Sequence, residues 1–200
     1  MYIIYDPKED ALGLPAGKHD VVMALNDKKY NATGDLMSPD SELDSFYGDI
    51  IQVNDQPWPY FAVEPRRYRL RFFDMSLSRP YQLVFVDDEG KTLPFQVIAS
   101  DAGLFGAPVT VSELTIATGE RYEVVFDFCQ HPSRNITLKN TFELPFVPQY
   151  EHTDEVMLFV VGDNVTDNNN SGEVHAVLNP NVVWPKMDKT VDRSFTFGNG

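Results

Sequence analysis

The run from Arg67 to Phe73 constrains the fold of this chain more than any other stretch. Three arginines alternate there with Tyr68, Leu70 and Phe72. The arginines are Arg67, Arg69 and Arg71. A period of two is typical of a β-strand with one apolar face and one polar face. We expect the arginine face to point outward and to pair with neighbouring acids.

Similar runs recur along the chain with turn residues between them, and none shows a helical apolar stripe. The expected strands are Tyr2–Tyr5, Asp20–Leu25, Asp49–Val53, Tyr68–Phe73, Tyr81–Val86, Phe95–Ala99, Glu113–Ile116, Tyr122–Phe128, Asn135–Leu138 and Glu155–Val161. Asp87–Lys91 reads as a hairpin loop with Gly90 in the left-handed conformation. Asp40–Tyr47 is a candidate for one helical turn. The pattern predicts an all-β sandwich or barrel of seven to ten strands.

Composition excludes several classes of partner. The net charge is −14, so phosphate-rich nucleic acid and anionic membranes are repelled. No apolar run approaches the roughly 20 residues of a membrane helix. No basic and apolar leader follows Met1, so we expect no signal peptide in this chain, which would then be either a cytosolic protein or a mature or excised piece.

Four blocks together resemble one family. They are Gly48–Pro59, Glu64–Arg79, Leu93–Leu104 with Pro108, and Gly119–Phe128. In this order and spacing they resemble the second, middle cupredoxin-like domain of a multicopper oxidase, in the group of fungal bilirubin oxidase and spore-coat laccases. Asp55 and Ala102 stand where that family usually has glycine.

The resemblance implies a division of the chain. Residues 1–162 correspond to a cupredoxin-like Greek-key domain, 163–192 to an interdomain linker, and 193–200 to the truncated first strand of the following domain. We expect the chain after Asp163 to be mobile, or ordered only by contact with another molecule.

Copper ligands are not grouped in the sequence. The family's copper sites use His-X-His pairs and a His-Cys-His run, whereas the four histidines here are far apart in sequence. They are His19, His131, His152 and His175, and the first three are expected in exposed loops. Cys129 is the only cysteine, so no internal disulfide exists. We therefore expect no catalytic and no metal-binding residue in this chain, and copper in the parent enzyme only.

Two arginines match family positions at strand ends. Arg79 and Arg121 are expected to have structural roles, with Asp101 as partner of one of them, because a guanidinium can hold two loops together. Three aromatic residues, Trp58, Phe61 and Trp184, are candidates for contacts with flanking domains.

Four glycosylation sequons begin at Asn31, Asn135, Asn164 and Asn169. Together with the family resemblance, they favour a secreted, glycosylated parent.

The resemblance implies an oxidase that couples oxidation of phenolic or tetrapyrrole substrates to reduction of dioxygen to water. The flanking domains would be partners of this one, which would be inactive alone. One alternative is a free-standing carbohydrate- or protein-binding module, whose mark would be an exposed row of aromatics and binding in glycan titrations. Another is a small copper enzyme, which copper content would reveal.

Overall fold

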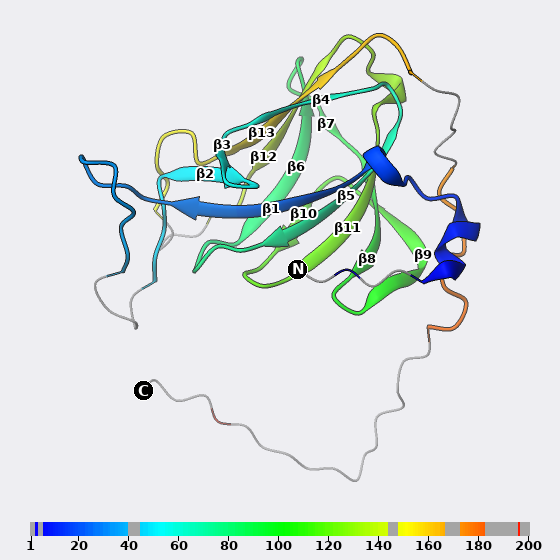
Figure 1. Ribbon diagram of the computed structural model, residues 1–200, viewed down its shortest axis with the longest axis horizontal. Helices are drawn as coiled ribbons and strands as arrows, with labels where there is room; N and C mark the ends of the chain where they lie inside the picture. The colour runs from blue at the N-terminus through cyan, green and yellow to red at the C-terminus, as the bar shows by residue number, and fades with distance from the viewer. Residues whose placement is uncertain are drawn as a thin grey trace.

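The computed structural model describes Ile3, residues 6–39, 45–143, 148–166 and 173–182, and Thr196. These residues form two packed β-sheets (Figure 1). The strands are β1 (Asp20–Lys28), β2 (Ile50–Val53), β3 (Gln56–Pro57), β4 (Tyr60–Val63), β5 (Arg67–Asp74), β6 (Tyr81–Asp87), β7 (Thr92–Leu93), β8 (Phe95–Ser100), β9 (Gly103–Val111), β10 (Leu114–Ile116), β11 (Arg121–Asp127), β12 (Asn135–Asn140) and β13 (Glu155–Val161). Three 3-10 turns complete the described elements: η1 (Pro7–Leu12), η2 (Gly17–His19) and η3 (Phe128–Gln130).

The strand order shows long-range connections in both sheets. The seven-stranded sheet has the order β3-β2-β1-β5-β11-β8-β9, and β1 runs parallel to β5. The six-stranded sheet has the order β10-β6-β12-β13-β4, with β7 paired to β6 and β13 parallel to β4. The prediction of an all-β sandwich is thus confirmed.

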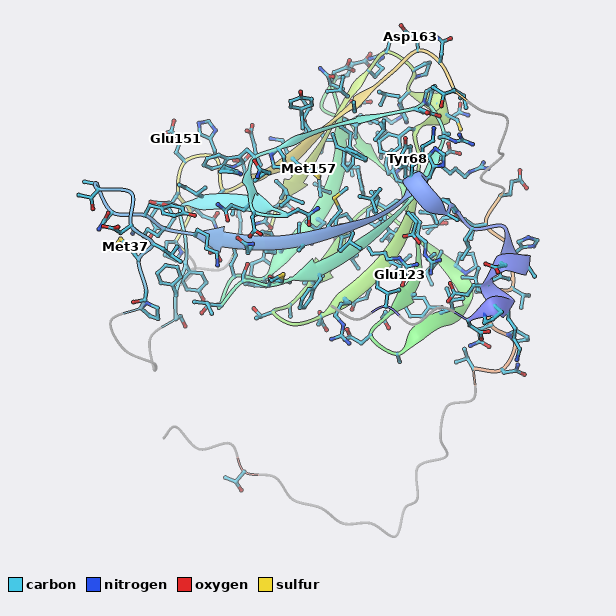
Figure 2. The ribbon with its side chains drawn as sticks, viewed as in Figure 1. Met37, Tyr68, Glu123, Glu151, Met157 and Asp163 are labelled. Carbon is cyan, nitrogen blue, oxygen red and sulfur yellow. The ribbon has the colours of Figure 1, made fainter. Side chains whose placement is uncertain are left out.

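Apolar side chains from the inner faces of both sheets fill the space between them. Tyr68, Leu70 and Phe72 of β5 are 4% exposed or less, and Tyr68 and Met157 lie between the layers in Figure 2. Phe85 of β6 stacks on Phe126 of β11 with ring centroids 4.2 Å apart. The alternation in β5 therefore decides which of its side chains point into the space between the sheets.

Nine of the expected strands are present with small shifts in their ends. The expected strand Tyr2–Tyr5 lies outside the described residues, apart from Ile3. Sequence patterns missed β3, β4, β7 and β9, so the described residues hold thirteen strands and not seven to ten. Both β4 and β9 lie at sheet edges, where the prolines and glycines that flank or interrupt them are tolerated.

The expected local features have different outcomes. The turn between β6 and β7 has Gly90 at φ +83°, as the sequence predicted. Residues 45–47 form no helical turn, and residues 40–44 lie outside the described part. Among the described residues no helix is long and apolar enough to span a bilayer.

A second, smaller hydrophobic cluster lies on the other side of the seven-stranded sheet. Leu14 and Leu178, from the two ends of the chain, pack there with Ile98 of β8 and Val125 of β11. Leu178 is 4% exposed and its N–H donates to the carbonyl of Gly106 at 3.0 Å. The expectation that the chain after Asp163 is mobile or ordered only by another molecule is therefore wrong for residues 173–182. The physical reason is that Leu178 packs on Ile98 and Val125, a contact between distant parts of the sequence that local patterns do not reveal.

The turn between β2 and β3 is a tight hairpin in which both central residues are left-handed. Asn54 has φ +51° and Asp55 has φ +63°. The side-chain amide of Asn54 holds this turn to β1: its oxygen accepts from the N–H of Ala24, and its nitrogen donates to the carbonyl of Val22. Asp55 occupies a conformation that glycine adopts with less strain.

We expect Asp55→Gly to raise the free energy of unfolding by about 0.5–1 kcal/mol, since the native φ strains any residue with a Cβ. Urea denaturation would measure it. The matched control is Ala102→Gly at the other position where family glycine is replaced. Ala102 is not among the residues with positive φ, so that change should bring no gain. Equal effects of the two substitutions would contradict the explanation.

Candidate functional site

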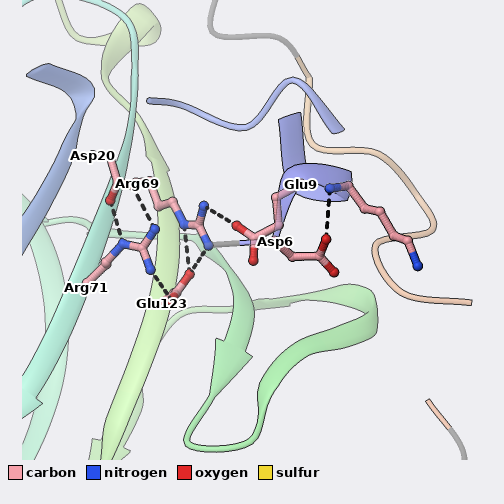
Figure 3. Close-up of polar contacts among 7 residues, drawn as sticks. Asp6, Glu9, Asp20, Arg69, Arg71 and Glu123 are labelled. Atoms are coloured by element: carbon pink, nitrogen blue, oxygen red, sulfur yellow. Dashed lines mark hydrogen bonds and ion pairs between the residues drawn. The ribbon is translucent and has the colours of Figure 1, made fainter. Parts of the chain in front are cut away.

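Strand pairing brings a charged cluster together on the face of β5 opposite the core. Glu123 of β11 lies directly across from Arg71 of β5. Its carboxylate accepts hydrogen bonds from both Arg71, at 2.5 Å, and Arg69. Figure 3 shows Glu123 between the two guanidinium groups. The cluster therefore joins two neighbouring strands through side chains as well as through backbone pairing.

Two further carboxylates come from the N-terminal part of the chain. Asp20 binds Arg71 in a fork, at 2.7 and 2.8 Å, and Glu9 of η1 accepts from Nη1 of Arg69 at 3.1 Å. Asp6 caps η1 by accepting from the N–H of Lys8 (Figure 3).

The expected pairing of this arginine face with acids is confirmed, but its expected exposure is wrong for two of the three arginines. Arg69 and Arg71 are 4% and 5% exposed, because η1 and the carboxylates cover them. Only Arg67, paired with Asp127 at 3.0 Å, keeps substantial exposure. Buried guanidinium groups whose forks are filled by carboxylates stabilise a local arrangement and are poor anion sites.

A hollow of about 290 Å³ lies next to this cluster. Its lining includes four members of the charged cluster and the β8–β9 turn; the four are Glu9, Arg69, Arg71 and Glu123. Arg121 and Asp101 also line the hollow. Nε of Arg121 is 3.1 Å from Asp101, whose carboxylate also accepts from the N–H of Arg121 at 2.8 Å. Both side chains are close to half exposed, and Arg121 donates to the carbonyl of Gly119 at 2.9 Å.

Arg79 lies in a different and fully buried environment. Its Nε donates to Oδ2 of Asp27 at 2.9 Å, and its side chain is 1% exposed. Nη2 donates to the carbonyls of Gly48, at 2.9 Å, and Pro148, at 3.5 Å. The guanidinium also lies 5.6 Å from the ring centre of Tyr47. One side chain thus contacts three separate stretches of chain at one end of the sandwich.

Gly48 is required at this point by a close approach of two backbones. A Cβ on Gly48 would lie 2.5 Å from backbone atoms of Lys28. Its N–H donates to the same Asp27 oxygen that Arg79 binds, at 2.6 Å. The glycine of the first sequence block is therefore part of the Arg79 environment.

Asp74, at the end of β5, is a buried carboxyl that sequence analysis did not single out. It is 0% exposed, its Oδ1 accepts from the N–H of Ser76, and its Oδ2 has no hydrogen-bond partner. Burial, with Asp27 and Glu120 nearby, raises its pKa to about 7. A signal existed, because the alternation that buries Tyr68, Leu70 and Phe72 also points Asp74 inward. Glu123 had a similar signal in its alternating strand, whereas nothing local marked Glu9.

The aromatic candidates for interdomain contacts differ in position. Trp58 is 36% exposed, lines a hollow of about 240 Å³ and donates from Nε1 to the carbonyl of His152 at 3.1 Å. Phe61 is half-buried and packs edge-on against Tyr68 and Phe159, so its ring belongs to the core side. Tyr60, 75% exposed, is better placed for an external contact. Trp184 lies outside the described residues.

The sequons also differ in their surroundings. Asn31, Asn135 and Asn164 are exposed, and Asn169 lies outside the described residues. Asn31 closes a turn by accepting from the N–H groups of Thr33 and Asp35. Their glycosylation stays a prediction.

Among the described residues, the side chains that commonly bind copper are not grouped. Across the described part of the chain, which includes all four histidines and Cys129, no three metal-binding side chains come together. His19, expected to be exposed, is 6% exposed and packs against the Tyr68 ring at 5.1 Å. Cys129 is an exposed residue, but partial desolvation of its sulfur and the neighbouring Asp127 raise the pKa of its thiol to about 11, which disfavours the thiolate that binds metal.

A sequence profile described as multicopper oxidase matches residues 18–155, which is most of the chain. The chain belongs to the multicopper oxidase family. A bilirubin oxidase from Albifimbria verrucaria is 44% identical over 206 residues, covering 99% of this chain and 36% of that protein. A laccase from Bacillus subtilis is 36% identical over 152 residues, covering 70% of this chain and 29% of the laccase.

Solved multicopper oxidases share the fold. The McoA multicopper oxidase of the hyperthermophile Aquifex aeolicus superposes with a TM-score of 0.74 at 31% identity, covering 86% of this chain and 37% of McoA. The chain thus spans about a third of the length of these multicopper oxidases. Larger relatives of this kind are consistent with flanking domains in one polypeptide.

Proposed function

We propose that this chain is the middle domain of a three-domain multicopper oxidase and holds none of the copper itself. In this proposal it sets the distance between two copper-bearing domains and contributes to the wall of the substrate cleft. The observation that carries the proposal is the alignment of nearly the whole chain with about a third of a bilirubin oxidase. The scattered histidines support it, because the copper sites of such enzymes need clustered imidazole and thiolate ligands.

The parent would oxidise phenolic or tetrapyrrole substrates and reduce dioxygen to water. The names of the bilirubin oxidase and laccase relatives support this choice. We also propose that the parent is secreted and glycosylated, with Asn31, Asn135 and Asn164 as exposed acceptors. The interdomain linker and the truncated strand of a third domain would follow residue 162.

We expect the purified 200-residue chain to take up far less than one copper ion per molecule and to show no absorption near about 600 nm, where copper–thiolate centres absorb. Incubation with Cu(II), gel filtration and metal analysis would measure this. The control is the variant Cys129→Ser with His131→Ala, which should behave like the unmodified chain. Stoichiometric copper that this double variant loses would contradict the proposal.

A further inference from the structure

Two segments at opposite ends of the sequence lie beside each other on the seven-stranded sheet. Residues 6–19 precede β1, and residues 162–182 follow β13. In Figure 1 the dark blue η1 and the orange stretch 173–182 lie on the same side of the sandwich, next to β9. We call residues 6–19 the entering segment and 162–182 the leaving segment, of which residues 162–166 and 173–182 are described.

One apolar cluster on the seven-stranded sheet includes residues of both segments. Leu14 of the entering segment and Leu178 of the leaving segment belong to one cluster with Ile98 and Val125. At its margin pack Leu12, Leu104 and Val174. Leu14 is 9% exposed and Leu178 is 4% exposed. The cluster is separate from the main core.

A polar contact joins them a second time, around Glu64. Its Oε1 accepts from Lys18 at 2.8 Å and from the hydroxyl of Thr166 at 2.6 Å. The same Lys18 Nζ lies 2.8 Å from the Thr166 hydroxyl. Lys18 is in the entering segment and Thr166 in the leaving segment. Lys18 and Thr166 are also the main causes that lower the pKa of Glu64 to about 2, so this carboxyl is ionised at neutral pH.

Each segment also makes a contact of its own with the sheet. The entering segment is held by Glu9, which binds Arg69. The leaving segment is held at the free edge of β9, where the N–H of Leu178 donates to the Gly106 carbonyl. That bond occupies part of an edge that would otherwise be open to another chain.

We propose that the entering and leaving segments form one cooperative unit, so that displacing either one releases the other. The inference rests on the proposed function for its consequence: in a three-domain parent these segments lead to the two copper-bearing domains. The contacts that the two segments share would then fix the direction in which the chain enters and leaves this domain, relative to the seven-stranded sheet. The bridging domain would act as a rigid spacer and not as a flexible joint.

The test is hydrogen exchange on the full 200-residue chain. We expect Leu178→Ala to speed exchange at least about tenfold in residues 173–182 and also in residues 8–19, where Gly13 and His19 donate within turns. The matched control is Val177→Ala, because Val177 is 56% exposed and should affect neither segment. The reverse change, Leu14→Ala, should speed exchange in residues 173–182.

Faster exchange confined to the substituted segment would overturn the proposal. Peptides from β6 report whether the main core stays folded. If Leu178→Ala also loses protection there, Thr166→Val decides the matter, since it removes only the contacts of the Thr166 hydroxyl with Glu64 and Lys18. That variant should then speed exchange in residues 8–19, and unchanged exchange would overturn the proposal. Hydrogen exchange needs no copper and no flanking domain. A negative result would therefore overturn the cooperative unit without contradicting the proposed function.

Discussion

Arg79→Ala should lower the free energy of unfolding by about 3–5 kcal/mol, the range for removing one partner of a buried ion pair. Asp27 has no exposed side-chain surface and would lose its charged partner. The carbonyl of Gly48 would also lose a donor. Urea denaturation followed by fluorescence or circular dichroism would measure the change.

The matched control is Arg121→Ala. Arg121 and Asp101 are 44% and 45% exposed, so water replaces the lost partner and the change should stay below about 1 kcal/mol. The sequence alone assigned the two arginines equal structural roles. A double variant, Asp27→Asn with Arg79→Met, should recover much of the loss, because it leaves no unpaired buried charge. Equal urea midpoints for Arg79→Ala and Arg121→Ala would show that burial does not separate the two arginines.

Asp74→Asn should make the protein more stable at neutral and alkaline pH and change how stability depends on pH. The Asp74 pKa is raised from 3.8 to about 7 by burial. Because the folded state holds this proton more tightly, the stability it contributes is fully present below pH 4 and is lost as pH rises through about 7. The shift corresponds to roughly 4 kcal/mol at 1.36 kcal/mol per pKa unit.

The measurement is the difference in unfolding free energy between Asp74→Asn and the unmodified protein from pH 4 to pH 8. That difference should grow in favour of the variant as pH rises, since asparagine has no charge to bury. The control is Asp87→Asn, for which the difference in unfolding free energy should favour the unmodified protein as pH rises. The reason is that backbone N–H groups of Lys91 and Glu89 lower the Asp87 pKa. A difference for Asp74→Asn that does not change with pH would show that Asp74 is ionised throughout.

The sequence by itself determined the fold class, the family and most of the strands. Alternation in β5 and in β11 is a local property, since adjacent residues of a strand point to opposite faces whatever the strand pairs with. The turn at Gly90 was readable for the same reason, because a left-handed residue is a local requirement. The edge strands β4 and β9 were missed, since proline and glycine are local breakers that a sheet edge tolerates.

Only the tertiary structure decided which charged groups are buried. Alternation placed Arg69 and Arg71 on a face away from the core, but their burial depends on η1 and on Glu9, far away in the sequence. Arg79 and Arg121 look alike locally, yet the chain around Gly48 and Pro148 encloses one and leaves the other at the surface. Leu178 reads as part of a linker until Leu14, Ile98 and Val125 surround it. Burial is a sum over contacts distant in sequence, so it decides pKa values, ion-pair strength and the path of both chain ends, and local patterns do not contain it.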